Sequence, residues 1–255
     1  IHEVCRMTKL YHINLIEVNN MDLLYSVLSG LITTFLIYIV SRFFKYYKYL
    51  SLLFNKYRYY YQNIRFSIAY LYRIKIDDQY LLIKGNRIEQ FQPIGGVYKY
   101  YESFLSLKEL YEVKSDNPQN FCEGNDLRII VQGKNILNII DWFNTRKNRE
   151  VTVYREFYEE LIKSEIIDLE ALVRSNIEFI KQIEPTVKYS SHFEMQEILI
   201  FEIYELHLAA QDIRKIEASL SNGRLILVDM DSIKREHIRI KGKDCKIGEH
   251  SKYIL

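Results

Sequence analysis

Nineteen consecutive residues without a charge, Leu23–Ser41, constrain this 255-residue chain more than any other feature. At about 1.5 Å per residue, a helix of that length spans roughly 28 Å, close to the hydrocarbon thickness of a bilayer. The Ser and Thr hydroxyls in the stretch are tolerated there because they can bond to carbonyls of their own helix. The stretch therefore predicts a transmembrane helix over residues 21–45.

A buried core helix and a cleaved signal peptide are the two alternatives. A core helix of this length normally carries charged residues on its wet face. A signal peptide has basic residues before its apolar region and small residues after it. Here Asp22 precedes the stretch and "RFFKYYKY" follows it, so we expect a single retained span.

The charges around the span predict its orientation. Residues 23–76 contain no acidic residue but eight basic ones, which are Arg42, Lys45, Lys48, Lys56, Arg58, Arg65, Arg73 and Lys75. Lysine and arginine mark the cytoplasmic side of a span. We therefore expect the N-terminus outside and the larger C-terminal part in the cytoplasm. Residues 46–65, rich in tyrosine and basic side chains, predict a juxtamembrane stalk that continues as a helix along anionic headgroups.

Residues 1–20 show no clear periodicity, and Met21 stands directly before the span. We expect this N-terminal segment to be non-native or disordered, and we attach no function to it. The aromatic and basic mixture of the stalk is also compatible with nucleic-acid binding. Beside a membrane span we favour the lipid surface, so no direct DNA or RNA binding is expected.

Residues 66–255 alternate between strand and helix patterns without a Gly/Ser-rich linker, which predicts one α/β domain. Apolar and β-branched runs predict a hairpin over 70–85, a second strand pair over 126–140 with its turn at 133–135, and strands over 192–209 and 223–233. Three- and four-residue apolar spacing predicts helices over 151–164 and 168–183. We also expect Trp142 to be buried, and Arg146, Lys147 and Arg149 to form a solvated loop that would meet phosphates if a ligand pocket lay near.

The order of two motifs resembles a Nudix domain. Gly96 is followed after five residues by Glu102, and a later helix contains Arg155, Glu156, Phe157, Glu159 and Glu160. The Nudix box has the pattern Gly, five residues, Glu, seven residues, Arg-Glu-apolar-x-Glu-Glu-x-Gly-apolar. The resemblance implies a Nudix-like α/β/α sandwich with a long insertion, preceded by a single transmembrane helix.

Two departures from that pattern bear on activity. Arg155 lies 53 residues after Glu102, so 45 residues are inserted, and Ile162 replaces the glycine of the box. In active relatives the box glutamates hold magnesium, which neutralises a diphosphate and helps to activate water. Glu156, Glu159 and Glu160 are therefore the catalytic and metal-binding candidates if the chain is a hydrolase, with magnesium as the cofactor.

The erosion of the box favours ligand binding over hydrolysis. The box match makes Gly95, Gly96 and Arg155 the ligand-binding candidates, and no cofactor is expected for sensing.

A single span before a Nudix domain with a long insertion is similar to the SMODS-associated Nudix effectors of bacterial cyclic-oligonucleotide anti-phage signalling (CBASS). That resemblance implies a partner nucleotidyltransferase, a cyclic dinucleotide or oligonucleotide ligand, a homo-oligomer in the cell inner membrane, and abortive infection. A membrane-anchored, magnesium-dependent hydrolase of nucleoside diphosphate derivatives is the alternative. A third reading is a membrane subunit that recruits a protein and binds no nucleotide.

Overall fold

A computed structural model of the chain describes residues 2–85, 88–116 and 125–255, without the side chains of residues 2–22, 42 and 44–48. The chain divides into two compact units, Ile1–Ser51 and Leu52–Leu255.

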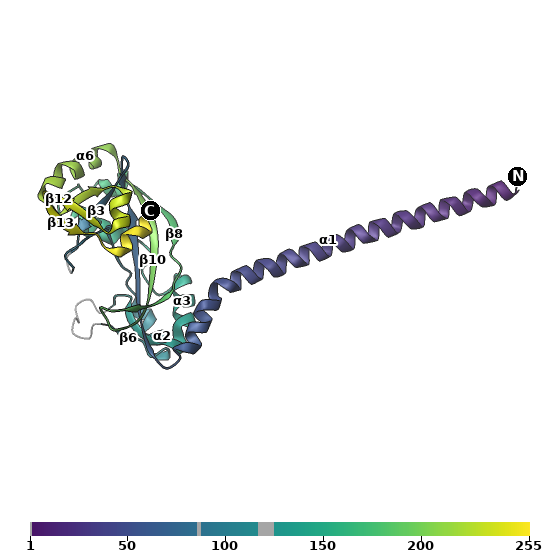
Figure 1. The fold of residues 1–255 in the computed structure, drawn as a ribbon, viewed down its shortest axis with the longest axis horizontal. Helices are drawn as coiled ribbons and strands as arrows, with labels where there is room; N and C mark the ends of the chain where they lie inside the picture. Colours follow the sequence, from purple (N-terminus) through teal and green to yellow (C-terminus); the bar gives the residue numbers. More distant parts are fainter. Residues whose placement is uncertain (1, 86–87, 117–124) are drawn as a thin grey trace. The chain divides into compact units, whose positions relative to one another are not determined.

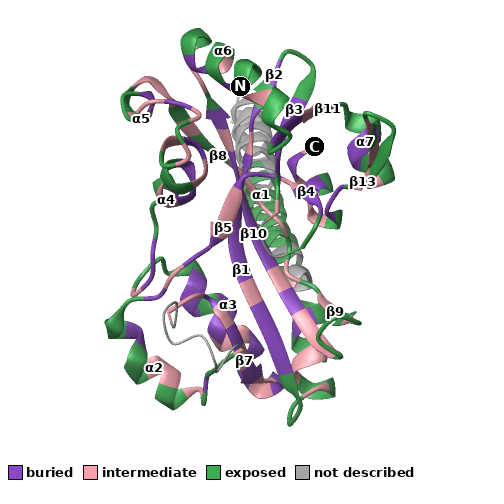
Figure 2. Cartoon of the chain, turned by 90° about the vertical axis from the view of Figure 1, so that its left-hand side faces the viewer, coloured by how far each residue is buried: buried purple, intermediate pink, exposed green. Residues whose placement is uncertain are grey.

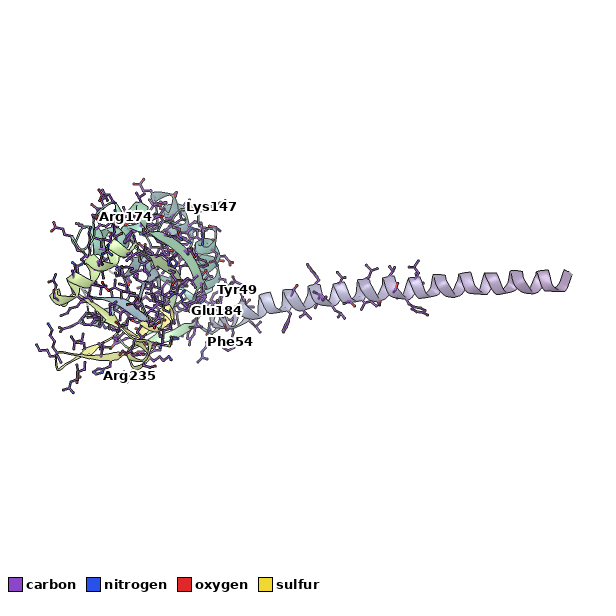
Figure 3. All side chains as sticks on the ribbon, turned by 90° about the horizontal axis from the view of Figure 1, so that it is seen from above. Tyr49, Phe54, Lys147, Arg174, Glu184 and Arg235 are labelled. Carbon is purple, nitrogen blue, oxygen red and sulfur yellow. The ribbon has the colours of Figure 1, made fainter. Side chains whose placement is uncertain are left out.

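Helix α1, His2–Arg58, contains the uncharged stretch. Leu23–Ser41 is long and apolar enough to cross a membrane, and its side chains are exposed in this structure (Figure 3). A signal sequence near an N-terminus has the same length and composition. The helix continues from residue 46 to Arg58. It therefore ends before the limit of the stalk predicted over residues 46–65, and Asn63, Ile64 and Arg65 belong to strand β1. The side chains of Arg42, Lys45 and Lys48 lie outside the described residues.

The second unit is built on two long strands, β1 and β10, that run parallel from the pair Ile64–Gln196 to the pair Arg73–Glu205. The outer edge of β1 is lined by β7 and then β5, and the outer edge of β10 by β9 and then β8, all antiparallel. Figure 1 shows β8 beside β10. Strand β6 extends the sheet beyond β7. The strands are β1 Asn63–Arg73, β5 Gly95–Val97, β6 Lys114–Ser115, β7 Arg128–Gln132, β8 Asn176–Gln182, β9 Val187–Ser190 and β10 Met195–His207.

The other described strands form two smaller sheets. One has the order β11-β3-β2, with β4 also paired to β3, and the other is the hairpin β12–β13. The β2–β3 pairing confirms the hairpin predicted over residues 70–85. The strands are β2 Lys75–Ile76, β3 Gln79–Lys84, β4 Phe91–Gln92, β11 Leu225–Val228, β12 His237–Ile240 and β13 Lys243–Lys246.

The helices of this unit are short, and several lie next to a 3-10 or π-helical turn. They are α2 Leu105–Leu110, α3 Ile136–Asn144, α4 Tyr154–Phe157, α5 Ala171–Arg174, α6 Ala210–Ser219 and α7 Met230–Arg235. The 3-10 turns are Glu102–Phe104, Gly133–Asn135, Leu220–Asn222 and Glu249–Ile254, and one π-helical turn covers Tyr158–Ile162.

The central strands are buried along most of their length (Figure 2). Because successive side chains of a strand point to opposite faces, β1 presents two different surfaces. Tyr72 on one face contacts Phe157 of α4, and Tyr98 beyond β5 contacts Phe143 of α3. Helices α3 and α4 therefore cover this face, which we call the helix face. The mixed α/β class predicted from the sequence is confirmed.

Three predicted elements need correction. The strand pair expected over 126–140 has only its first strand, β7, because Ile136, Ile139, Ile140 and Phe143 recur at helical spacing and bury one side of α3. The helix expected over 168–183 ends with α5 at Arg174. The alternating segment after it becomes β8, which pairs with β10. The strand expected over 223–233 ends at Val228, and Asp229 then caps α7 by accepting from the Ser232 backbone N–H.

Candidate functional site

The two halves of the box are brought together because the insertion begins and ends at one place. The Tyr101 backbone N–H donates to the Asn148 carbonyl at 3.0 Å, and the Glu150 N–H donates to the Lys99 carbonyl at 2.7 Å. Between these points the inserted chain forms α2, β6, β7 and α3, so it supplies part of the central sheet. The chain then returns to the box within reach of Gly96.

Gly95 and Gly96 leave room for two close approaches. A Cβ on Gly95 would lie 2.2 Å from the Tyr70 carbonyl oxygen, and a Cβ on Gly96 would lie 1.9 Å from Oε1 of Glu156. Both separations are far shorter than a non-bonded contact allows. Gly95 thus lets β5 pair closely with β1, and Gly96 lets Glu156 of α4 pack against β5. The structure brings Gly96 and Glu156 together, as the box resemblance implies.

The helical half of the box is one α-helical turn, α4, followed by the π-helical turn Tyr158–Ile162. The Lys163 N–H donates to the Tyr158 carbonyl, five residues back, at 2.8 Å. Phe157 and Leu161 are buried against the sheet. A π-helical turn is rare and often lies at a functional site. Ideal α-helical spacing does not describe it, so the positions of the glutamates are taken from their contacts.

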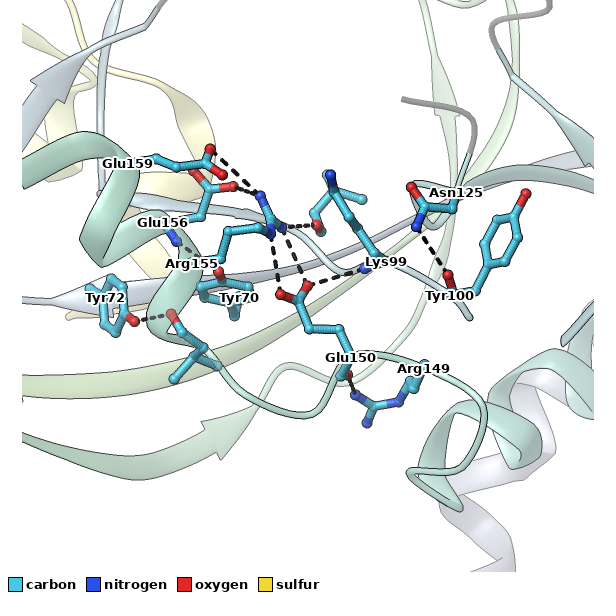
Figure 4. A network of polar contacts seen from close by, with 12 residues as sticks. Tyr70, Tyr72, Lys99, Tyr100, Asn125, Arg149, Glu150, Arg155, Glu156 and Glu159 are labelled. Atoms are coloured by element: carbon cyan, nitrogen blue, oxygen red, sulfur yellow. Dashed lines mark hydrogen bonds and ion pairs between the residues drawn. The ribbon is translucent and has the colours of Figure 1, made fainter. Parts of the chain in front are cut away.

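Arg155 of α4 connects this helix to strand β5, which contains Gly96 and Val97 (Figure 4). Its Nη2 donates to the Val97 carbonyl at 2.7 Å, and its Nε and Nη2 donate to the two carboxylate oxygens of Glu150 at 3.2 and 3.3 Å. Its Nη1 forms an ion pair with Glu156. Charge-assisted, forked bonds of this kind fix geometry strongly.

Of the two glutamates Glu102 and Glu150, it is Glu150 that contacts Arg155. Glu102 is exposed in the 3-10 turn before α2, whereas Glu150 also accepts from the Lys99 backbone N–H at 3.2 Å. The count of five residues from Gly96 pointed to Glu102 because the insertion hides the later glutamate. Only the position of Glu150, five residues before Arg155, marks it in the sequence.

Glu156 is buried, with 9% of its surface exposed, and its backbone N–H donates to the Tyr70 hydroxyl at 3.2 Å. Burial raises the pKa of its carboxyl from 4.5 to about 7, although the Arg155 guanidinium acts in the opposite direction. A carboxyl in such a site is poised to exchange a proton near neutral pH.

The other two box glutamates face different arginines. Glu159 is about half exposed, and its Oε2 lies 3.9 Å from Nη1 of Arg155. Glu160 forms an ion pair of 2.7 Å with Nη2 of Arg224, which directly precedes β11. The three carboxylates are therefore drawn toward cationic side chains that lie in separate parts of the unit.

This arrangement does not fit a magnesium ion. Magnesium requires oxygen ligands that converge on one point in near-octahedral geometry. Within residues 2–85, 88–116 and 125–255, no group of three or more His, Cys, Asp or Glu residues is placed to hold a metal ion. Each box glutamate lies within 4 Å of an arginine side chain, so we derive no hydrolytic step from these residues.

The loop after α3 departs from its prediction at Arg149. Arg146 and Lys147 are exposed and Trp142 is buried, as expected. Arg149 has only 2% of its surface exposed, and its Nε and Nη1 donate to the carbonyls of Phe143 and Glu150 at 2.9 and 2.7 Å. Backbone carbonyls near the end of a helix attract a cation, which turns this side chain inward.

Arg149 belongs to a buried polar cluster that sequence reasoning missed. Glu202 of β10 is 3% exposed, and it accepts from the hydroxyls of Tyr98 and Tyr204, the latter at 3.0 Å. Its Oε1 lies 3.9 Å from Nη2 of Arg149. Burial and the Glu202 charge raise the pKa of Tyr98 well above its usual range. The sequence signal is a single glutamate inside the apolar strand "LIFEIY", which needs an internal partner.

One comparison with known proteins identifies the family. A protein-family model described as the SMODS-associated NUDIX domain matches residues 63–255, which is the whole of the second unit from β1 onward. No curated protein and no solved structure gives a match. The matched residues include both halves of the box, the insertion between them and all the strands of the central sheet. The chain therefore belongs to the SMODS-associated Nudix family.

Proposed function

We propose that this chain is a membrane effector of antiviral defence. Its cytosolic Nudix domain senses a cyclic nucleotide made by a partner nucleotidyltransferase. Binding then drives oligomerisation of the transmembrane helix, disruption of the cell inner membrane and abortive infection. Two findings support the proposal: the SMODS association of the family suggests a role in a CBASS-linked pathway, and one N-terminal helix is apolar enough to span a membrane.

The observation that carries the proposal is the engagement of the box by arginines. Arg155 pairs with Glu156, and Arg224 pairs with Glu160. A carboxylate that is already neutralised by a guanidinium is a poor ligand for a divalent cation. Pairing of the box glutamates with arginines in a domain of the Nudix family supports sensing over hydrolysis.

The uncharged helix has the properties that self-association requires. The hydroxyls of Ser26, Ser29, Thr33 and Thr34 donate to carbonyls of their own helix at 2.8–2.9 Å, so they need no partner in lipid. With Gly30 they form a face of small side chains, which lets helices approach closely. One helix cannot line a pore, so several copies must assemble. A ligand shifts that assembly only if it binds one state more tightly.

The test uses the full chain in detergent micelles and in dye-loaded vesicles. We expect one of cyclic di-AMP, cyclic di-GMP or cyclic GMP–AMP to raise the unfolding temperature, as a ligand of the native state must. The same nucleotide should extend the cross-linked species beyond the monomer and release dye. Identical cross-linking with and without every nucleotide in the panel would contradict the proposal.

The box sequence itself favours a second candidate, the membrane-anchored hydrolase of nucleoside diphosphate derivatives. That candidate predicts magnesium-dependent product from ADP-ribose, and a loss of at least about a hundredfold in turnover when Glu159→Gln or Glu160→Gln is introduced. Stabilisation by a cyclic dinucleotide without turnover supports the sensor. Neither stabilisation nor turnover supports the third reading, a membrane subunit that recruits a protein.

A further inference from the structure

A cavity of about 520 Å³ lies on the face of the central sheet opposite to the helix face. On this side β1 presents Arg65, Ser67, Ala69 and Leu71, which alternate with the buried residues that point toward α3 and α4. Strand β10 adds Glu197, Leu199 and Phe201. The volume falls within the range of small-molecule sites, which is roughly 300–1,000 Å³.

The floor of the cavity is made of small residues. Ser67 and Ala69 of β1 and Gly95 and Gly96 of β5 all line the cavity. Larger side chains at positions 67 and 69 would fill the space above the sheet, whereas a side chain on Gly96 would point to Glu156 on the helix face. A floor of this kind leaves room for a flat group to lie against backbone.

Aromatic side chains stand at the walls. Tyr189 and Phe193 belong to the hairpin between β9 and β10 and are 63% and 42% exposed. On another wall the rings of Phe201 and His250 are nearly parallel, at 13° and 6.0 Å between centroids, with Tyr253 beside them. Exposed aromatic rings at a cavity are the groups on which nucleic-acid bases stack.

The polar groups of the cavity match the rest of a nucleotide. The side-chain amides of Gln90 and Gln92 offer both donors and acceptors, as needed to read a base edge. The Arg65 guanidinium is held by Asp116 at 2.9 Å and Glu197 at 3.0 Å, and it lies 3.8 Å above the Phe193 ring. Its charge is therefore neutralised by two carboxylates, and its main role is to hold the Phe193 ring in the cavity wall.

Lys188 on β9 is the better candidate for a phosphate. It lines the cavity and its side chain is exposed. None of the ion pairs found within residues 2–85, 88–116 and 125–255 involves it, and its charge acts on Glu249, which lines the same cavity. A lysine ammonium binds phosphate as a compact point charge. The cavity thus combines aromatic walls, two amides and a cation at the rim.

We propose, on the basis of the nucleotide-binding role proposed above, that this cavity holds the cyclic nucleotide. A base stacks on Tyr189 and Phe193, and a phosphate lies near Lys188. Gly95 and Gly96 take part because they border the cavity. Arg155 does not, since its donors are engaged with Glu150, Glu156 and Val97 on the helix face.

The test measures binding by the full chain in detergent micelles, using equilibrium dialysis with cyclic di-AMP, cyclic di-GMP, cyclic GMP–AMP, AMP and inorganic phosphate. Tyr189→Ala and Lys188→Glu change exposed rim residues, so the fold should survive. Tyr101→Ala and Lys243→Glu are matched controls at exposed positions outside the cavity. The fluorescence of Trp142, the one tryptophan of the chain, confirms that each variant is folded.

We expect wild type to bind at least one cyclic dinucleotide, and each rim variant to bind it about tenfold or more weakly, as the loss of a base-stacking or phosphate contact implies. The controls should bind as wild type does. Wild-type affinity in both rim variants would overturn the cavity site while leaving the sensor role standing. Binding of inorganic phosphate alone would overturn the stacking role, and a wild-type chain that binds no cyclic dinucleotide would overturn the sensor role itself.

Discussion

The carboxylate of Glu156 occupies the space that a β-carbon would need at position 96. In the present structure that carbon would lie 1.9 Å from Oε1, and the nearest three heavy atoms around it all belong to Glu156. The two residues are sixty positions apart in the sequence, and the insertion that separates them is closed by backbone hydrogen bonds at its ends. The contact between Gly96 and Glu156 therefore forms only when the two halves of the box are packed together.

Gly96→Ala should destabilise the second unit by about 1–3 kcal/mol, the usual cost of forcing an extra carbon into a packed site. The free energy of unfolding is measured by urea titration of the full chain in detergent, with Trp142 fluorescence as the signal. Trp142 is buried in α3, so its emission follows this unit.

The control for that variant is the same substitution in a Glu156→Ala background. Removing the carboxylate clears the space, so Gly96→Ala should cost less there than in wild type, and the two changes should couple. Additive effects of the two substitutions would show that the residues do not touch.

The raised pKa of Glu156 predicts a stability that falls with rising pH. Folding lifts the pKa of this carboxyl from 4.5 to about 7, so the folded protein holds the proton more tightly than the unfolded chain does. The stabilising protonation is complete below pH 4.5 and is lost as pH rises to about 7. The loss is on the order of 2–3 kcal/mol.

Glu156→Gln has no titrating group at this position and serves as the reference. The difference in unfolding free energy between wild type and Glu156→Gln, measured at pH 5 and pH 8, should move against wild type at the higher pH. A difference that stays constant between these values would exclude a perturbed pKa at Glu156.

Glu150, which contacts Arg155, and Glu102, which is exposed, give a matched pair of alanine variants. Glu150→Ala removes the two carboxylate oxygens that accept from Nε and Nη2 of Arg155, one of which also accepts from the Lys99 N–H. It should cost about 1.5–3 kcal/mol. Glu102→Ala changes an exposed side chain and should cost less than about 0.5 kcal/mol. Urea titration measures the free energy of unfolding of the two variants. Equal losses would show that the Glu150 contacts contribute no more to stability than the exposed Glu102 side chain does.

Two glutamates of β10 should respond very differently to replacement by alanine. Glu202→Ala leaves Arg149 buried opposite an empty site and removes the acceptor of two tyrosine hydroxyls, so it should cost about 3–5 kcal/mol. Glu205→Ala breaks a more exposed pair with Arg73 and should cost about 1 kcal/mol or less. Similar unfolding midpoints for the two variants would show that the buried cluster contributes little.

The parts of the structure that local sequence patterns predicted are those with a clear apolar run. The 70–85 hairpin and strand β10 contain short runs of apolar and β-branched residues, and the uncharged stretch has the length of a membrane-spanning helix. The prediction of a strand over residues 136–140 is wrong because "NILNII" is rich in β-branched residues, which favour strands, although its apolar positions recur at helical spacing. The strand after Arg174 was misread because its pairing with β10 overrides the helical pattern that precedes it.

The candidate site shows where sequence reasoning ends. The match to the box brought Gly96 and Glu156 together correctly across the insertion. No spacing rule showed that Glu150 would take Arg155, because that depends on hydrogen bonds between Lys99 and Glu150 that only the folded insertion creates. Arg149 was expected in solvent since it lies in a charged segment, and its burial depends on the carbonyls of α3. Such effects of tertiary contact are not encoded in local periodicity.

The parallel pairing of β1 with β10 has a consequence for biosynthesis. Partner residues such as Ile64 and Gln196 are separated by 132 positions, so the first strand leaves the ribosome long before its neighbour exists. At about 5–20 residues per second the interval is on the order of ten seconds. During this interval β1, with its apolar run Ile68–Tyr72, has no partner strand at the translating ribosome, and it follows a helix that is apolar enough to enter the bilayer. We expect nascent copies to depend on chaperones, and premature truncations before residue 195 to be degraded and never to accumulate.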